Sequence, residues 1–586
     1  MKKLMILGSV AVMAALTSCD KFLDDNRYPE SVVPVNPEFW SKQINVTQEV
    51  NNFYGNWGGY DLSTWYTSVA GENGASYLSD DQGGARVDMA NWLYTNTPSS
   101  STAWTAPYIQ IRNANNIIEG VESGSLSGTA FANDAIAKAR LHRAKQYFLL
   151  VKRYGDVPLV TKVLDPTDEA ELYGPRTPRD QVMDFVLEDI NYAVANISTQ
   201  SSKTEFSTDL ATAMKNEICL FEGTYAKYVE GNASRAQTYL QAAVEAGEAI
   251  VARYPVNTAP EAYWAIYNTL NLALRNNPEI IFCKLYNQGV MMHSTADYSN
   301  ATDGNSGITK DAFDSFLFLD GRPLASTTMD TTDEGVLEGN ATTGYGINIS
   351  NLLAVRDQRL SYITYEHLFF DDMQWSAVNS SPMMSATGYG VKKFNNYAMT
   401  QGQLQTGGQN FTSCPVYAVN RVMLSVAEAK AELGTLTDAD VNTYLNPLFT
   451  RAGLPTQTVA GLSAINDPAN NMGVSSLIWE IRRCRRCELM YDDALRYWDL
   501  IRWKQLDKLV TTVNPNANLG ANITPWLNAL DAAGNPNQRA NTNGYLNVDY
   551  NNRGYRATME DRQYFFPIPN DQLGLNPNLV QNPGWN

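Results

Sequence analysis

Apolar residues recur at steps of three and four along several long stretches of the chain, and this spacing predicts a mainly helical protein. One clear stretch runs from Asp134 to Tyr154, where Gly155 supplies a helix stop and Pro158 prevents continuation. Another begins near Thr177, just ahead of a proline that suits the first helical position. Helices separated by long connections are therefore the expected architecture.

Two pairs of helices are expected to form antiparallel hairpins. Residues 209–229 and 234–253 are joined by a short Glu-Gly-Asn turn, and residues 421–433 and 438–452 meet around Gly434. Hairpins of this kind stack in tetratricopeptide-like arrays, although the strict sequence pattern of those repeats is not visible here. The sequence thus predicts a tetratricopeptide-like scaffold of helical hairpins without a countable repeat.

Other parts of the chain lack helical spacing and are predicted to be rich in loops. Residues 55–104 are dense in glycine, and residues 286–420 are dense in Gly, Asn, Ser and Thr with only short apolar runs, which favours loops with a few short strands. Residues 511–560 are also rich in Asn, Ala and Gly and are expected to form loops. The helical scaffold is then expected in residues 106–285 and 421–508.

The strongest helical pattern lies near the C-terminal end, where one long helix is expected to begin at Ser475 or Ser476 and to run past Trp503. Cys484 and Cys487 form a CxxC pair on its apolar face. A redox or metal site there would need two further ligands, and the sequence offers no second CxxC or nearby His, so both are expected to be core residues. Four arginines interleave with this face and are expected on a solvated or salt-bridged surface: Arg482, Arg483, Arg485 and Arg486.

Composition and charge narrow the classes of function. The 586 residues are 44% hydrophobic and 18% charged, which excludes a disordered chain. The formal net charge is −17, from 44 Lys and Arg against 61 Asp and Glu, and no long basic run occurs, so nucleic acid is a poor partner. Only three histidines are present, and besides Cys19 there are five cysteines, an odd number for a disulfide framework. No metal or cofactor is expected.

The pattern of the first residues indicates a targeting signal. Two lysines precede the apolar run Leu4–Leu16, which is too short to span a bilayer as a helix and suits the core of a signal peptide. The run ends in Leu16-Thr17-Ser18-Cys19, which is similar to the lipobox of bacterial lipoproteins. Residues 1–18 are therefore expected to be removed and Cys19 to be lipidated. Residues 19–38 would then form a tether. The alternative is an ordinary secretory signal with an incidental Cys.

Seven stretches of the chain, in order, resemble the SusD/RagB family of outer-membrane nutrient-binding lipoproteins. They are Cys19 with Phe22-Leu23-Asp24, Ala139 to Val160, Tyr173 to Asp189, Phe313 to Leu324, Glu428 to Leu454, Arg482 to Trp503, and Phe566 to Gly584. Cys484 and Cys487 depart from the family pattern, which usually has Glu and an aliphatic residue there. These motifs belong to the scaffold, so the departures concern local packing and say nothing about the ligand.

The resemblance implies a SusD-like fold for residues 19–586 as one domain, whose ligand is held by the loop-rich regions. It implies a surface-exposed glycan-binding lipoprotein of the cell outer membrane that captures oligosaccharides and delivers them to a SusC-like TonB-dependent transporter. It implies no catalysis and no cofactor. A RagB-like subunit that carries peptides is the alternative. A glycoside hydrolase is less favoured: the 61 acidic residues could include a catalytic pair of carboxylates, but no catalytic motif occurs in the sequence.

The candidate ligand residues come from the loop-rich regions. Sugar rings stack on flat aromatic side chains while Asp, Asn and Arg bond the hydroxyls, so exposed aromatic residues with polar neighbours are the signal. The resemblance implies ligand loops in residues 55–104 and after Phe282, where Tyr286 and His293 also lie. Trp40 and Trp104 are expected to be core residues, and any single loop aromatic could instead fill a gap under its loop. The ranked candidates are Trp92, Arg86 and Asp81, then Tyr77 and Tyr298, then Trp65.

Overall fold

The computed structural model describes residues 37–60, 79–83, 96–295, 307–340, 344–368, 385–492, 494–531, 540–548 and 559–585. The predictions for the signal peptide and for Cys19 lie outside these residues. Within them, the protein is mainly helical, with three two-stranded antiparallel sheets, as the sequence predicted. In the same ranges, no helix is both long and apolar enough to cross a membrane.

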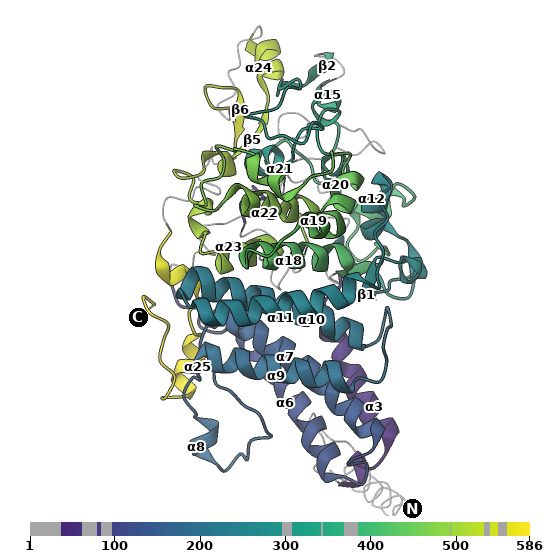
Figure 1. The fold of residues 1–586 in the computed structure, drawn as a ribbon, viewed down its shortest axis with the longest axis vertical. Helices are drawn as coiled ribbons and strands as arrows, with labels where there is room; N and C mark the ends of the chain where they lie inside the picture. Colours follow the sequence, from purple (N-terminus) through teal and green to yellow (C-terminus); the bar gives the residue numbers. More distant parts are fainter. Residues whose placement is uncertain are drawn as a thin grey trace, which may run out of the picture.

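The helices stack in layers along the long axis of the molecule (Figure 1). The lower layer contains α2 (Pro37–Trp40), α3 (Gln43–Asn51), η1 (Asn52–Asn56), α6 (Thr102–Ser123), α7 (Ala130–Tyr154), α8 (Glu169–Leu172) and α9 (Arg179–Asn196). The middle layer is α10 (Thr208–Tyr225) with α11 (Ala233–Val251), and the layer above it contains α18 (Val419–Glu432), α19 (Asp438–Tyr444), α20 (Asn446–Arg451), α21 (Val459–Ala464), α22 (Ser476–Glu488) and α23 (Leu495–Arg502).

The remaining elements are short and lie within or beside the connections. They are α12 (Pro260–Asn268), η4 (Asn271–Asn276), α14 (Lys310–Asp314), α15 (Ser350–Leu353), α16 (Arg359–Ile363), α17 (Gln401–Gln405), η5 (Leu506–Leu509), η6 (Pro515–Asn518), α24 (Thr524–Asp531), η7 (Asp561–Tyr564) and α25 (Asn570–Leu575). The strands pair as β1 (Ile280–Lys284) with β4 (Cys414–Ala418), β2 (Val336–Asn340) with β3 (Gly344–Asn348), and β5 (Leu519–Asn522) with β6 (Tyr545–Asn547). Residues 511–560 thus contain a helix and two strands where only loops were predicted.

The first predicted hairpin is confirmed. Helices α10 and α11 pack closely, and the turn between them is a π-helical segment, Ala226–Glu230, followed by Gly231 at φ 68°. An added Cβ at Gly223 would lie 2.7 Å from Leu240, so glycine lets the two helices approach each other. The second hairpin is also confirmed, but its return arm is two helices, α19 and α20, because Pro447 has no N–H to continue the first of them.

The single long helix predicted from residue 475 past Trp503 is wrong. Helix α22 ends at Glu488 and α23 begins at Leu495, and between them Tyr491 and Ala494 adopt positive φ values of 67° and 57°. The break is held by the carboxylate of Asp492, which accepts a hydrogen bond from Lys393 Nζ at 2.6 Å and another from Tyr267 at 2.7 Å. Long-range polar contacts therefore override a helical period that continues in the sequence.

Residues 559–585 return from the upper part of the molecule to the lower helices, where α25 lies near α9 (Figure 1). The amide N–H of Phe566 donates to the carbonyl of Arg153 at 2.7 Å, and Asn582 Nδ2 donates to the carbonyl of Tyr154 at 3.0 Å. Gly155, at φ 70°, ends α7 as predicted and lets the Phe565 ring lie against the backbone. These residues close the end of α7.

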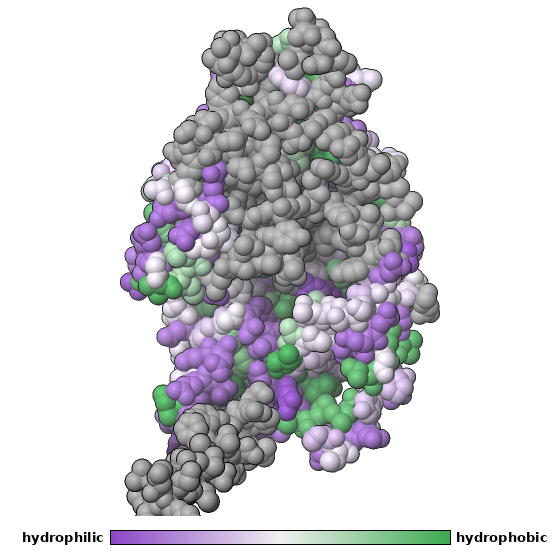
Figure 2. Space-filling model, turned by 180° about the vertical axis from the view of Figure 1, so that it is seen from behind, coloured by the Kyte–Doolittle hydropathy of each residue, from purple (hydrophilic) through white to green (hydrophobic). Residues whose placement is uncertain are grey.

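The described surface of the lower helices is mixed in character, with hydrophobic residues in small groups among hydrophilic ones (Figure 2). The large aromatic side chains predicted to be core are buried: Trp40 is 4% exposed and Trp104 is 3% exposed. The five described cysteines are free and buried, which agrees with the predicted lack of a disulfide framework.

The CxxC pair is part of the core, as predicted, and we expect it to be chemically inert. Burial raises the pKa of Cys484 and of Cys487 to about 12, so the nucleophilic thiolate is scarce at neutral pH. Iodoacetamide at about pH 8 should therefore label neither residue in the folded protein and both after unfolding in guanidinium. Mass spectrometry of the labelled peptides measures this, and rapid labelling of the native protein at both positions would contradict it.

Candidate functional site

Two loop-rich regions that are far apart in the sequence meet at residues 79–83. Gln82 forms an antiparallel bridge with Ile308, and the N–H of Gly83 donates to the carbonyl of Gly307 at 3.0 Å. Thr309 completes the contact, since its N–H donates to the carbonyl of Asp81 at 3.0 Å. The region predicted within residues 55–104 is thus joined to the region that follows residue 286.

Further loop segments reach the same place. Gly83 lies against Thr387 and Val548, since an added Cβ would be 3.0 Å from the first and 3.2 Å from the second. The carbonyl of Thr387 in turn accepts from the N–H of Ala521 in β5 at 2.8 Å. Residues 79–83, 307–309 and 385–389, together with the paired strands β5 and β6 and Val548, therefore form one junction of four parts, which we call the loop junction.

Two adjacent carboxylates fix the loop junction to the helical scaffold. Asp80 accepts two hydrogen bonds from Arg496, both at 2.7 Å, and Asp81 accepts one from Arg486 Nε at 2.6 Å. Burial alone would raise the pKa of Asp80, but the guanidinium groups of Arg486 and Arg496 outweigh it and hold the pKa below the usual value. For Asp81, burial is the larger effect and raises the pKa.

Of the ranked ligand candidates, only Asp81 lies within the described residues. It is 3% exposed, and its carboxylate is engaged with Arg486, so its place in the structure is that of an anchor for the segment. The other five candidates fall outside the described residues and stay predictions: Trp65, Tyr77, Arg86, Trp92 and Tyr298. Both regions that hold them flank the loop junction in sequence.

Tyr286 and His293, which the sequence places in the ligand-loop region, are packed inside, and so is Trp57 in the first loop-rich region. Tyr286 and His293 are fully buried, and the hydroxyl of Tyr286 donates to the carbonyl of Tyr60 at 2.6 Å. Burial lowers the pKa of His293 to about 3, so the imidazole is neutral and bonded to Thr412. Trp57 is 1% exposed and donates to His142 at 2.9 Å. These residues fill space beneath the loops, as the alternative for any single loop aromatic predicts.

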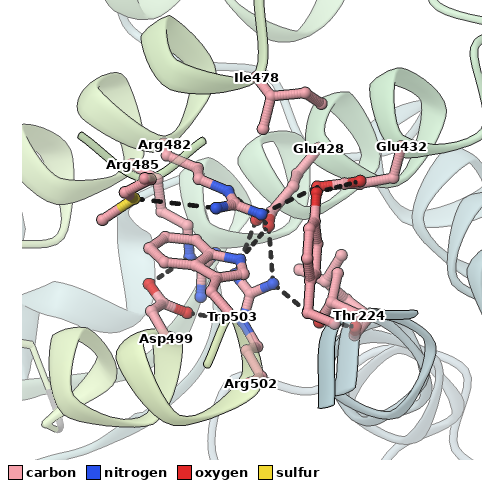
Figure 3. Close-up of polar contacts among 12 residues, drawn as sticks. Thr224, Glu428, Glu432, Ile478, Arg482, Arg485, Asp499, Arg502 and Trp503 are labelled. Carbon is pink, nitrogen blue, oxygen red and sulfur yellow. Dashed lines mark hydrogen bonds and ion pairs between the residues drawn. The ribbon is translucent and has the colours of Figure 1, made fainter. Parts of the chain in front are cut away.

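A buried ion-pair network beneath the loop junction was missed by the sequence reasoning (Figure 3). Glu428 on α18 accepts two hydrogen bonds from Arg502 and one from Trp503 Nε1, each at 2.7 Å. Asp499 bonds Arg502 at 2.9 Å and Arg485 at 2.8 Å. The four arginines predicted at a solvated or salt-bridged surface are all ion-paired but at most 8% exposed, so the predicted pairing is confirmed and the predicted place at the surface is wrong.

The network ties three layers together. Glu432, one helical turn after Glu428, accepts from Arg482 of α22 at 3.1 Å and from Lys227 after α10 at 2.7 Å. Arg502 also donates to Thr224 of α10 at 3.0 Å. Because each buried charge has several partners, the network fixes the positions of α10, α18, α22 and α23 relative to one another. It therefore positions the helices that carry the anchors of the loop junction.

Glu488 is a second buried centre, and we expect it to make stability depend on pH. Burial alone would raise its pKa, but Arg451 and Arg359 outweigh burial and lower it from 4.5 to about 2. Since the folded-state pKa is the lower one, the stabilisation is complete above about 4.5 and is lost as the pH falls toward about 2. The Glu488→Gln variant lacks this carboxylate.

The gap in free energy of unfolding between the parent and Glu488→Gln should therefore shrink as the pH falls through that window. Urea unfolding at a series of pH values measures it. A gap that stays constant from about pH 6 to about pH 3 would contradict the assignment.

The carboxylates of the loop junction are buried and ion-paired. In the part of the chain that the structure describes, no group of three or more His, Cys, Asp or Glu could hold a metal ion. The fold and the loop junction define a class of protein in which stacked helical hairpins carry an assembly of loops that are distant in the sequence.

The family assignment follows from comparison with known proteins. A model described as SusD family matches residues 278–585, and one described as starch-binding associating with outer membrane matches residues 21–220. The first match covers more than half of the chain, so the protein belongs to the SusD family, as its motifs predicted.

Relatives and solved structures agree with this assignment. A SusD-like protein of Bacteroides ovatus is 38% identical over 106 residues, which are 18% of this chain and 19% of that protein. A SusD-like protein of Formosa agariphila is 26% identical over 213 residues. The matched parts span 19% of the length of the Bacteroides ovatus protein and 38% of the length of the Formosa agariphila protein.

The fold matches a crystal structure of a SusD-like carbohydrate-binding protein from Bacteroides fragilis at a TM-score of 0.68 and 20% identity, covering 92% of this chain and all of that one. A second SusD-like protein from Bacteroides fragilis matches at a TM-score of 0.66 and 22% identity, covering 96% of this chain and 99% of that one. At these identities the likeness establishes the fold, which is SusD-like and mainly helical.

Proposed function

We propose that this protein is a surface-exposed, lipid-anchored protein that binds oligosaccharides at the loop junction and delivers them to a SusC-like TonB-dependent transporter. The observation that carries the proposal is the joining of four distant loop segments on a rigid helical scaffold, in a member of a family whose solved relative is a carbohydrate-binding protein. Loops positioned by a rigid scaffold are a common setting for ligand binding.

The rigidity of the junction supports binding more than catalysis. Asp80 and Asp81 are buried and ion-paired, so neither carboxylate is free to act as an acid or a nucleophile there. A glycosidase needs two carboxyl groups facing one sugar bond across roughly 5–10 Å. We therefore infer a binding protein that leaves its sugar intact.

Titration of the mature protein with a panel of oligosaccharides, and with peptides beside them, tests the proposal. Binding of an oligosaccharide without release of shorter products is the expected result. Single Ala substitutions at Trp65, Tyr77, Trp92 and Tyr298 should then weaken that binding, with a loss on the order of 2 kcal/mol for a central stacking residue. Peptide binding alone would favour the RagB-like alternative, and hydrolysis would favour the glycosidase.

The lipid anchor makes a separate prediction. Replacing Cys19 by Ala removes the thiol that would carry the acyl chains, so the variant should remain unlipidated and leave the outer-membrane fraction. Metabolic labelling with a palmitate analogue and membrane fractionation measure this. A variant that still incorporates the label would show that Cys19 is not the modified residue.

The transporter partner is tested by isolation of the native complex. A mild-detergent pull-down of the tagged protein should recover a much larger outer-membrane protein in near-equal amount. Recovery of the protein alone, under conditions that preserve other lipoprotein complexes, would count against delivery to a transporter while leaving oligosaccharide binding in place.

A further inference from the structure

A cavity next to the loop junction is not used by the proposed function. It has a volume of about 310 Å³ and lies between the segment 323–325 and helix α22. This size falls at the lower end of the range for small-molecule sites, roughly 300–1,000 Å³. The cavity adjoins the junction because Arg486 and Arg496 line it and also hold Asp81 and Asp80.

The cavity has an apolar wall. Pro323 and Leu324 come from the connection after α14. Met472 comes from the loop before α22, and Trp479 comes from the start of α22. The side chain of Trp479 is partly exposed and is fixed in place because its indole N–H donates to Asp467 at 3.1 Å. A rigid wall of this kind suits a ligand with an apolar face.

The opposite wall is polar, but its positive charges are compensated. Arg482 bonds Glu432 at 3.1 Å, Arg483 bonds Glu480 at 3.1 Å, Arg486 pairs with Asp311 at 2.7 Å and Arg496 bonds Asp80 at 2.7 Å. Since every guanidinium that lines the cavity already holds a carboxylate, the wall offers no unpaired positive charge to an anion. It offers fixed N–H groups and carboxylate oxygens, which suit a neutral ligand with several hydroxyls.

Polar groups at the cavity still have capacity for hydrogen bonds. Asp311 and Asp314 keep 22% and 20% of their side-chain surface exposed. Arg482, which is 2% exposed, directs Nη1 at the sulfur of Met472 at 3.8 Å, a weak acceptor. The side-chain amide of Asn516 makes no hydrogen bond to any residue that the structure describes.

We propose that this cavity is a second carbohydrate subsite that takes one neutral pyranose ring. The C–H face of the ring would pack on Trp479 and Leu324, while its hydroxyls would bond Asp311, Asp314 and the amide of Asn516. The proposal rests on the proposed function, because it extends the same class of ligand to a second site. It also connects the two sites, since the arginines of the cavity hold the anchors of the loop junction.

The test uses the mature protein in mild detergent and single neutral sugars as probes. Glucose, galactose, mannose and N-acetylglucosamine are titrated by saturation-transfer difference NMR, with glucuronate as the charged counterpart. We expect at least one neutral sugar to bind with millimolar affinity and glucuronate to bind more weakly than its neutral parent.

A blocking variant and a matched control locate the binding. Leu324→Trp places an indole in the cavity from a residue that is 40% exposed, and should weaken the sugar by at least about tenfold. Val336→Trp makes the same kind of change on β2, outside the cavity, at a residue that is 58% exposed, and should leave binding unchanged. Asn516→Ala, which keeps the cavity open, should weaken binding severalfold.

The outcomes separate this inference from the proposed function. If no neutral single sugar binds, or if Leu324→Trp and Asn516→Ala bind it as the parent does, the cavity is not a subsite, whereas oligosaccharide binding at the loop junction is unaffected. If glucuronate binds more tightly than every neutral sugar, the neutral assignment is wrong. If no glycan of any length binds, the proposed function fails as well.

Discussion

Replacing Glu428 by Gln is expected to lower the free energy of unfolding by about 3–5 kcal/mol, because it removes one of the two buried carboxylates that compensate the charge of Arg502. In the folded protein the two carboxylate oxygens of Glu428 accept two hydrogen bonds from Arg502 and one from Trp503. Gln has nearly the same shape but carries no charge and only one acceptor oxygen. Chemical unfolding followed by circular dichroism measures the change.

An exposed ion pair supplies the matched control. Glu38 and Lys42 lie 3.1 Å apart, with 72% and 55% of their side chains exposed, so water already screens the pair. Glu38→Gln should therefore change the free energy of unfolding by less than about 1 kcal/mol. Equal effects at Glu428 and Glu38 would show that the network of Figure 3 does not stabilise the fold.

Replacing Arg486 by Met should have two effects, one on stability and one on binding. Met keeps much of the apolar stem but leaves Asp81 and Asp311, which Arg486 holds at 2.6 and 2.7 Å, without their main partner. We expect a loss of about 3–5 kcal/mol in the free energy of unfolding. Arg486 is one of two arginines that anchor residues 79–83, and Arg496 still holds Asp80 in the variant. Oligosaccharide binding at the loop junction should therefore be weakened even where the protein stays folded.

The control for this change is Arg322→Met, at an exposed arginine on the connection that follows α14. It should unfold and bind like the parent. Thermal unfolding and oligosaccharide titration of both variants, at a temperature where each is folded, separate the two effects. An Arg486→Met protein that binds normally would show that the anchor does not position the ligand loops.

The helical scaffold could be predicted because its signals are local. The stop at Gly155 and the hairpin turn at Gly231 depend on residues that are neighbours in the chain, and both appear in the structure. The break after Glu488 could not be predicted, because the residues that hold Asp492 are Lys393 and Tyr267. The spacing of apolar residues carries no information about partners that far away.

For the candidate site too, the local sequence did not reveal partners that lie far away in the chain. The arginine run resembles a surface because several of its counter-charges lie far away in the sequence: Asp81 is 405 residues from Arg486, and Glu432 is 50 residues from Arg482. The i, i+4 pair of Glu428 and Glu432 on a predicted helix was a signal that could have suggested buried partners. For the loops, composition could indicate where a ligand face would form, but the joining of residues 79–83 to residues 307–309 depends on tertiary structure alone.

The return of residues 559–585 to the lower helices has a consequence for biosynthesis. The carbonyl of Tyr154 accepts a hydrogen bond from Asn582, which the ribosome adds 428 residues later. At translation rates of roughly 5–20 residues per second, that interval is on the order of 20–90 s. Throughout it, the end of α7 has no native cover, so the layer that is made first is completed last. The nascent chain must therefore be kept from aggregating over a period much longer than the folding time of a single helical hairpin.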